Sequence, residues 1–205
     1  MKRSLLVFLL VFPLVGIALA DQTAGKPLQV TEVGKDSFQA DFVSGGQLRM
    51  HIRSGELRVI GSDENKIRVN YSGKNGSKTS DVTVSLKTVG NNAELRVSGG
   101  PHNDFRIEIQ VPKNSGLYLR MPAGDLEVNG LTGDKDVEIH AGDMTLGVGK
   151  ADDYGHVDAS VNAGDLDAQP FGVSKGGLFR SFDKHGGGKY RLHAHVGAGD
   201  LVLRE

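Results

Sequence analysis

The chain has 205 residues, a formal net charge of −1, and neither cysteine nor tryptophan. A nucleic-acid-binding protein usually carries a basic excess, so this balance of charge argues against that class. Without cysteine the protein has no disulfide bonds and no acylated cysteine of a lipoprotein, and its stability has to come from packing and backbone hydrogen bonds.

The first twenty residues have the pattern of an export signal. Lys2 and Arg3 precede an apolar run, Leu5–Ile17, of about 13 residues, which is shorter than the roughly 20 that a membrane-spanning helix needs. Ala18-Leu19-Ala20 then fits the small-x-small motif of signal peptidase. We therefore predict a signal peptide over residues 1–20 and export to the periplasm or the cell surface, with no membrane insertion after cleavage. An uncleaved N-terminal anchor is the alternative.

The pattern of the remaining residues predicts one domain made of short strands. Residues 21–37 are polar and aperiodic, which predicts a lead-in segment, whereas residues 38–205 alternate apolar and polar with a period of two. The 29 glycines lie between these alternating segments, as expected for strands joined by tight turns. Alternating segments between turns over about 62–115 predict a hairpin-rich insert.

An internal repeat is the clearest feature of the sequence. The motif Ala-Gly-Asp-apolar-x-apolar starts at Ala123, Ala141, Ala163 and Ala198, and a looser copy starts at Ser54. An alternating strand precedes every copy, and in each one the apolar residues before and after the turn face the same interior. The steps of 18, 22 and 35 residues suit coils of about 20 residues with excursions. We therefore predict an all-β, single-domain β-solenoid in which each coil stacks on the previous one.

Two parts of this expected stack have special positions. The longest step contains the segment 176–188, which predicts an excursion from the coil. The final strand, Leu201–Leu203, lies at the extreme C-terminus, where we expect an open sheet edge through which a dimer could form. The sequence leaves the oligomeric state open.

Three segments together resemble a known family. They are Ser54-Gly55-Glu56-Leu57-Arg58-Val59, Phe105-Arg106-Ile107-Glu108-Ile109-Gln110-Val111-Pro112 and the serial Gly-Asp-apolar repeats. This combination resembles the bacterial putative-adhesin β-solenoid family, a domain of unknown function, over roughly residues 38–205. The resemblance implies an envelope or surface protein of adhesin type without a defined ligand. It supplies no catalytic residues.

The acidic residues of the repeats are the first candidate site. In-register stacking would align Asp125, Asp143, Asp165 and Asp200 along one edge, with Glu56 as a further member, at a spacing of about 4.8 Å. Such carboxylates repel each other unless something offsets the charge. Backbone N–H groups within each turn are one solution, and Ca²⁺ is the other. No other cofactor is expected.

The outward strand positions form a second candidate site. The sequence places His193 and His195 on one face of a strand, and the repeat register makes Glu138 a lateral neighbour of His195. The two histidines beside Glu138 or Asp158 could bind a transition metal, whereas the alternative is a solvated sheet face with cross-strand charge pairs. The same mixed face could dock a glycan or a protein of the envelope.

Catalysis has little support in the sequence. Nucleophile-elbow, His-Glu-x-x-His and phosphate-loop motifs are absent, and the adjacent carboxylates Asp152 and Asp153 read as a solvated turn. Tyr118, Tyr154 and Tyr190 are the few candidates for exposed stacking rings. We therefore predict a non-enzymatic exported envelope protein, either structural or an adhesin-like binding module. The alternative is a polysaccharide-active enzyme, which a groove with converging carboxylates would favour.

Overall fold

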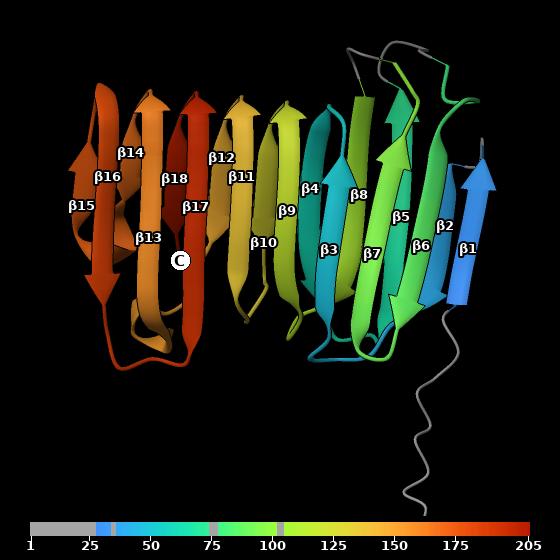
Figure 1. Cartoon of the computed structure of the whole chain (residues 1–205), viewed down its shortest axis with the longest axis horizontal. Helices are drawn as coiled ribbons and strands as arrows, with labels where there is room; N and C mark the ends of the chain where they lie inside the picture. The colour runs from blue at the N-terminus through green and yellow to red at the C-terminus, as the bar shows by residue number, and fades with distance from the viewer. Residues whose placement is uncertain (1–27, 34–35, 74–77, 102–104) are drawn as a thin grey trace, which may run out of the picture.

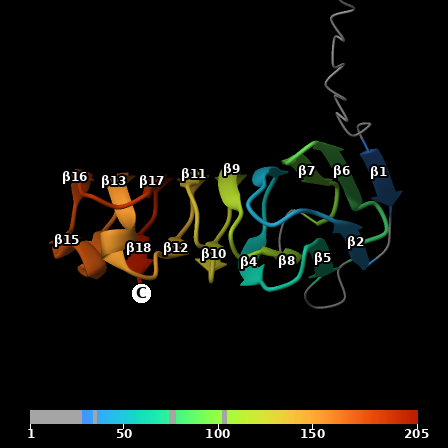
Figure 2. The same cartoon turned by 90° about the horizontal axis from the view of Figure 1, so that it is seen from below.

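Two β-sheets facing each other make up the part of the protein that the structure describes. The computed structural model describes residues 28–33, 36–73, 78–101 and 105–205, and the predicted signal peptide lies outside them. Each sheet has nine strands, and the two form separate layers (Figures 1 and 2). None of the described residues forms a helix with the length and hydropathy to span a membrane. The all-β prediction is confirmed.

The first sheet, called sheet A here, contains in spatial order β1 (Leu28–Val33), β6 (Thr83–Val89), β7 (Asn92–Ser98), β3 (Gln47–Ile52), β9 (Gly116–Ala123), β11 (Lys135–Ala141), β17 (Tyr190–Ala198), β13 (Tyr154–Ala163) and β16 (Leu178–His185). Sheet B contains β15 (Val173–Lys175), β14 (Leu166–Ala168), β18 (Leu201–Arg204), β12 (Met144–Gly147), β10 (Leu126–Asn129), β4 (Glu56–Ser62), β8 (Phe105–Pro112), β5 (Lys66–Gly73) and β2 (Ser37–Asp41). Two short 3₁₀ turns, η2 (Ala151–Asp153) and η3 (Gln169–Phe171), complete the elements.

Each sheet has a parallel centre and antiparallel ends. In sheet A the six strands from β7 to β13 pair in parallel, and in sheet B the six from β14 to β8 do the same. A central strand of sheet A together with the strand of sheet B that follows it in the chain is called a rung here. In spatial order the rungs are β7–β8, β3–β4, β9–β10, β11–β12, β17–β18 and β13–β14.

The apolar residues of both sheets point into the space between them. Parallel register aligns Leu48, Leu117, Lys135, Leu192 and Val157 across neighbouring strands of sheet A, and all five are buried. Burial of a leucine side chain contributes about 1.5–3 kcal/mol, so repeated rows of this kind are the main source of stability in a chain without disulfide bonds. The aligned lysine is the exception in this row.

The range predicted as a hairpin-rich insert has a larger role than expected. β6 and β7 form an antiparallel hairpin, and β5 pairs antiparallel with β8. However, β7 and β8 also pair in parallel with β3 and β4, so they extend both sheets by a further rung. The polar lead-in predicted over 21–37 also contains a strand, because β1 pairs with β6 at the edge of sheet A.

The predicted open edge at Leu201–Leu203 is wrong. β18 lies inside sheet B between β12 and β14, with parallel pairing on both sides. The chain leaves the stack after β14, forms the antiparallel edge strands β15 and β16, and returns to place its last rung beside β11 and β12. The last rung of the chain therefore lies between two earlier ones, and the predicted basis for a dimer through the final strand is lost.

Candidate binding face on the outer side of sheet A

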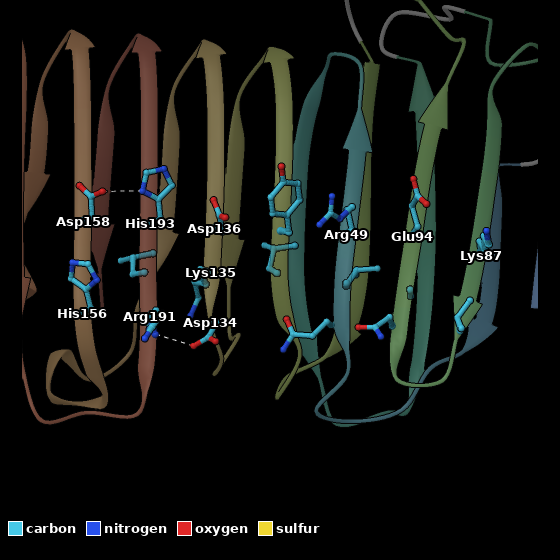
Figure 3. A pocket seen from close by; sticks show the side chains of 18 residues that line it. Arg49, Lys87, Glu94, Asp134, Lys135, Asp136, His156, Asp158, Arg191 and His193 are labelled. Atoms are coloured by element: carbon cyan, nitrogen blue, oxygen red, sulfur yellow. Dashed lines mark hydrogen bonds and ion pairs between the residues drawn. The ribbon is translucent and has the colours of Figure 1, made fainter. Parts of the chain in front are cut away.

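The outward residues of sheet A form a continuous row. Because the central strands are parallel and in register, one outward residue of each strand lies beside the next. This charged row consists of Glu94, Arg49, Tyr118, Asp136, His193 and Asp158. Figure 3 shows the side chains on neighbouring strands of one face. Acidic, basic, aromatic and imidazole groups therefore meet on one surface.

A groove of about 800 Å³ follows this row. Its lining comes from seven strands, β6, β7, β3, β9, β11, β17 and β13, and is concentrated near the beginnings of the central strands. Besides members of the charged row, it includes Gln47, Lys87, Asp134 and Arg191. The groove is thus long, crosses the strands and is lined by both signs of charge.

Arg120 organises the middle of the face. Its Nη2 atom lies 2.7 Å from Asp136 Oδ1 and 3.0 Å from Glu138 Oε1, so one guanidinium holds two carboxylates. The same guanidinium lies 4.0 Å from the ring centroid of Tyr118, and that of Arg49 lies 4.2 Å from it. These cation–π contacts hold the tyrosine ring against one guanidinium from its own strand, β9, and one from β3. Tyr118 is therefore already stacked by the protein itself.

His193 lies on β17, on the opposite side of β11 from Arg120, and contacts two carboxylates. Its Nδ1 atom lies 3.1 Å from Asp158 Oδ2, and its Nε2 atom lies 3.4 Å from Glu138 Oε1. Donor atoms of Asp136, Glu138 and His193 lie within 4.8 Å of one another, close enough for a metal ion. An ion there would have to compete with Arg120, which already forms ion pairs with both carboxylates.

Of the predicted group His193, His195 and Glu138, only His193 and Glu138 contact each other in the structure. Glu138 and His195 are lateral neighbours in the register, as the repeat predicted. However, His195 Nδ1 lies 2.9 Å from Ser160 Oγ, on the side away from Glu138. His193 is thus the imidazole that joins Glu138, and Asp136 is the third member of the group.

The aspartates of the repeat do align, in the spatial order Asp125, Asp143, Asp200, Asp165. Each of the first three accepts, through Oδ1, the backbone N–H of the next aspartate in this order, at distances of 3.3, 2.9 and 2.9 Å. These carboxylate oxygens therefore accept hydrogen bonds from the backbone of the neighbouring rung, whereas the structural alternative from the sequence placed such bonds within each turn. The looser copy has Glu56 at this position, and its carboxylate pairs with Arg106.

Lys135 was missed by sequence reasoning. Its side chain is buried in the leucine row, where Nζ donates to Tyr154 Oη at 2.7 Å and to Gly133 O at 3.3 Å. Burial lowers the pKa of Lys135 to about 8, although the charge of Asp134 opposes this shift. The signal was present, because Lys135 occupies the inward position six residues before Ala141, where the other copies have leucine or valine.

The predicted stacking rings are less accessible than expected. Tyr154 is buried against Phe171 and Tyr190, so its assignment as an exposed ring is wrong. Burial also raises the pKa of its phenol above the usual value. Tyr190 is half-buried, and Asp152 and Asp153 are exposed in η2, as expected for a solvated turn.

Comparisons with known proteins give a limited result. No family model matches the chain, and no curated protein matches it. A solved structure described as a putative cell adhesion protein from Clostridium sporogenes is similar with a TM-score of 0.49 and 14% sequence identity. The match covers 87% of this chain and 99% of that one.

Proposed function

We propose that this chain is an exported, non-enzymatic protein of the cell envelope that binds a glycan chain along the charged row of sheet A. The groove carries the proposal, because its lining spans seven parallel and antiparallel strands. At a strand spacing of about 4.8 Å, seven strands extend over roughly 29 Å. A surface of this length fits an extended polymer better than a compact metabolite.

The chemistry of the groove favours a polar ligand. Carboxylates, guanidinium groups, amides and imidazoles line it beside apolar residues such as Leu48, Leu117 and Leu192. The polar groups donate and accept hydrogen bonds as hydroxyl-rich polymers require. Because two guanidinium groups cover Tyr118, sugar rings would be held by hydrogen bonds and not by stacking on this ring.

The pairing of the carboxylates supports binding over hydrolysis. Asp136 is held by Arg120 and Asp158 by His193. A glycosidase needs one carboxylic acid that protonates the leaving group and a second carboxylate that is free to act as nucleophile or base. Carboxylates that are already paired with a guanidinium or an imidazole fit the first role poorly.

We further propose that the six rungs form a β-solenoid-like stack that serves as a stiff scaffold outside the cytoplasm. The support is the in-register parallel pairing of all six rungs in both sheets and the signal-like pattern of residues 1–20. Exposed edges would be limited to the antiparallel strands at the two ends of the stack.

A glycan array and a pull-down with cell-wall polysaccharide test the proposed function. We expect saturable binding to one glycan class, weakened about tenfold (~1.4 kcal/mol) by Arg49→Ala. Arg58→Ala is the matched control, because Arg58 is equally an exposed arginine but lies on sheet B, paired with Glu127.

Two results would contradict the proposed function. One is the absence of glycan binding by the unmodified protein, and the other is an equal loss of binding in both arginine variants. Capture of a single envelope protein in place of a glycan would replace the glycan by a protein partner.

A further inference from the structure

Two histidines and an aspartate meet at the edge of sheet A, outside the paired network of Arg120. His156 on β13 and His185 on β16 are direct cross-strand partners, and their rings stack at 4.5 Å with an interplanar angle of 10°. Asp183 lies between them: Oδ2 is 2.9 Å from His156 Nε2, and Oδ1 is 3.0 Å from His185 Nε2. The Nε2 atoms of both imidazoles thus share one carboxylate.

The neighbouring pair adds a second carboxylate. Asp158 and Asp183 are direct cross-strand partners on the same outward face. Like charges at opposed positions of two strands are destabilising, so this arrangement calls for positive charge nearby. His193 Nδ1 lies 3.1 Å from Asp158 Oδ2, and Arg191 is the lateral neighbour of His156. A bound cation would offset the remaining repulsion.

We propose that His156, Asp183 and His185 bind a divalent transition metal ion of the Zn²⁺ type. Imidazole nitrogens and a carboxylate are ligands that Zn²⁺ prefers, with bonds of about 2.0–2.1 Å, and two donors of a tetrahedral ion are then about 3.3 Å apart. The nitrogen–oxygen distances of 2.9 and 3.0 Å are within a few tenths of an ångström of this separation. Water would complete the coordination.

The surroundings favour this group over the one around His193. There, Arg120 occupies both Asp136 and Glu138, so a metal would have to displace a guanidinium. The described ion pairs of Asp183 are with the two imidazoles themselves, so a metal would displace no guanidinium or ammonium group from this carboxylate. Solvent also reaches the group, since the side chain of His185 is 76% exposed.

Titration of the tag-free protein with Zn²⁺ by calorimetry tests the site, and Co²⁺ absorption reports the geometry. We expect one bound ion, and at least about tenfold weaker binding in His185→Gln and in Asp183→Asn. Both side chains are exposed, so the fold should persist, as circular dichroism will verify. Proton–nitrogen NMR spectra should show that the Nε2 atoms of His156 and His185 shift together on metal addition.

His193→Gln is the matched control, because it removes an imidazole from the competing group on the same face. It should leave Zn²⁺ affinity unchanged. The proposal is overturned if the protein binds no Zn²⁺, or if His193→Gln abolishes binding while His185→Gln retains it. Because His156 also lines the groove, Zn²⁺ binding is measured without glycan, so that its outcome does not depend on the glycan result.

Discussion

Carboxylates occur at two places on the rungs, the Ala-Gly-Asp corner and the outer face of sheet A, but they find their partners in different ways. At the corner, Asp143 Oδ1 accepts the backbone N–H of Asp200, and its own N–H is donated to Asp125. On the face, Asp136 and Asp158 are paired with the side chains of Arg120 and His193.

Under the proposed function, this difference separates the structural role of the corner from ligand recognition by the face. Contacts with the backbone need the same residue in every rung, and the Gly-Asp dipeptide does recur in four of them. The charged row instead changes from strand to strand, through Glu94, Arg49, Tyr118, Asp136, His193 and Asp158. A corner fixed by the backbone thus leaves the face free to carry ligand specificity.

The largest expected effect is on the corner glycine. Gly142 has a φ of +124°, and an added Cβ would lie 2.1 Å from the carbonyl oxygen of Gly124. Gly142→Ala should therefore lower the free energy of unfolding by about 3–5 kcal/mol, since both the backbone conformation and the stacking distance forbid a side chain. Chemical denaturation measures this loss.

Gly149→Ala is the control for this prediction. Gly149 also has a positive φ, +62°, but nothing lies within 4 Å of an added Cβ. Its cost should be only about 1–2 kcal/mol, from the left-handed conformation alone. Equal losses in the two variants would show that stacking at the corner contributes nothing beyond backbone strain.

The second effect concerns the buried amine of Lys135. Its pKa is about 8 in the folded protein and 10.5 for a free lysine, so the folded state binds the proton less tightly. The free-energy cost of burying the charged amine is fully present below pH 8 and disappears as the pH rises to 10.5. The free energy of unfolding therefore increases with pH in this window. At ~1.4 kcal/mol per unit, the increase is about 3 kcal/mol.

Lys135→Met should remove this pH dependence. The difference in unfolding free energy between the unmodified protein and Lys135→Met should rise by about 3 kcal/mol in favour of the unmodified protein between pH 8 and 10.5. Loss of the hydrogen bond to Tyr154 adds a constant offset, because burial raises the pKa of that phenol. Lys150→Met, at an exposed position, should show no such trend; a parallel trend there would refute the assignment.

The sequence predicts pairing within a rung better than order between rungs. Period-two alternation and the Ala-Gly-Asp motif were enough for the strands, the inward faces and the lateral register of Glu138 with His195. The position of β18 between β12 and β14 could not be predicted, because parallel register is equally satisfied beside any rung. The position of β18 is decided by the return of the chain after β16, which brings distant segments of the sequence together.

The candidate sites followed the same division. The alignment of Asp125, Asp143 and Asp200 came from the motif, whereas their backbone partners on the next rung depend on side-chain rotamers. The pairing of His156 with His185 joins β13 to an excursion that has no repeat motif, so its register had no sequence signal.

A smaller effect is expected at the aspartate of the corner. Asp143→Ala leaves the N–H of Asp200 without its acceptor and should cost about 1 kcal/mol, whereas Asp143→Asn keeps an oxygen at this position and should cost less. Thermal unfolding with and without Ca²⁺ checks the alternative. A rise in the melting temperature of the unmodified protein with Ca²⁺, lost in Asp143→Asn, would show that the aligned aspartates of the repeat bind a cation.

The smallest effect on stability is expected on the face itself. His193→Gln removes two partly exposed ion pairs, which contribute about 0–1 kcal/mol to folding. The same change should weaken glycan binding measurably, because His193 lies on the charged row and lines the groove. Binding isotherms and denaturation curves of one protein sample compare the two quantities. A large loss of stability would mean that the face, like the corner, is a structural element, and the separation of scaffold from recognition would fail.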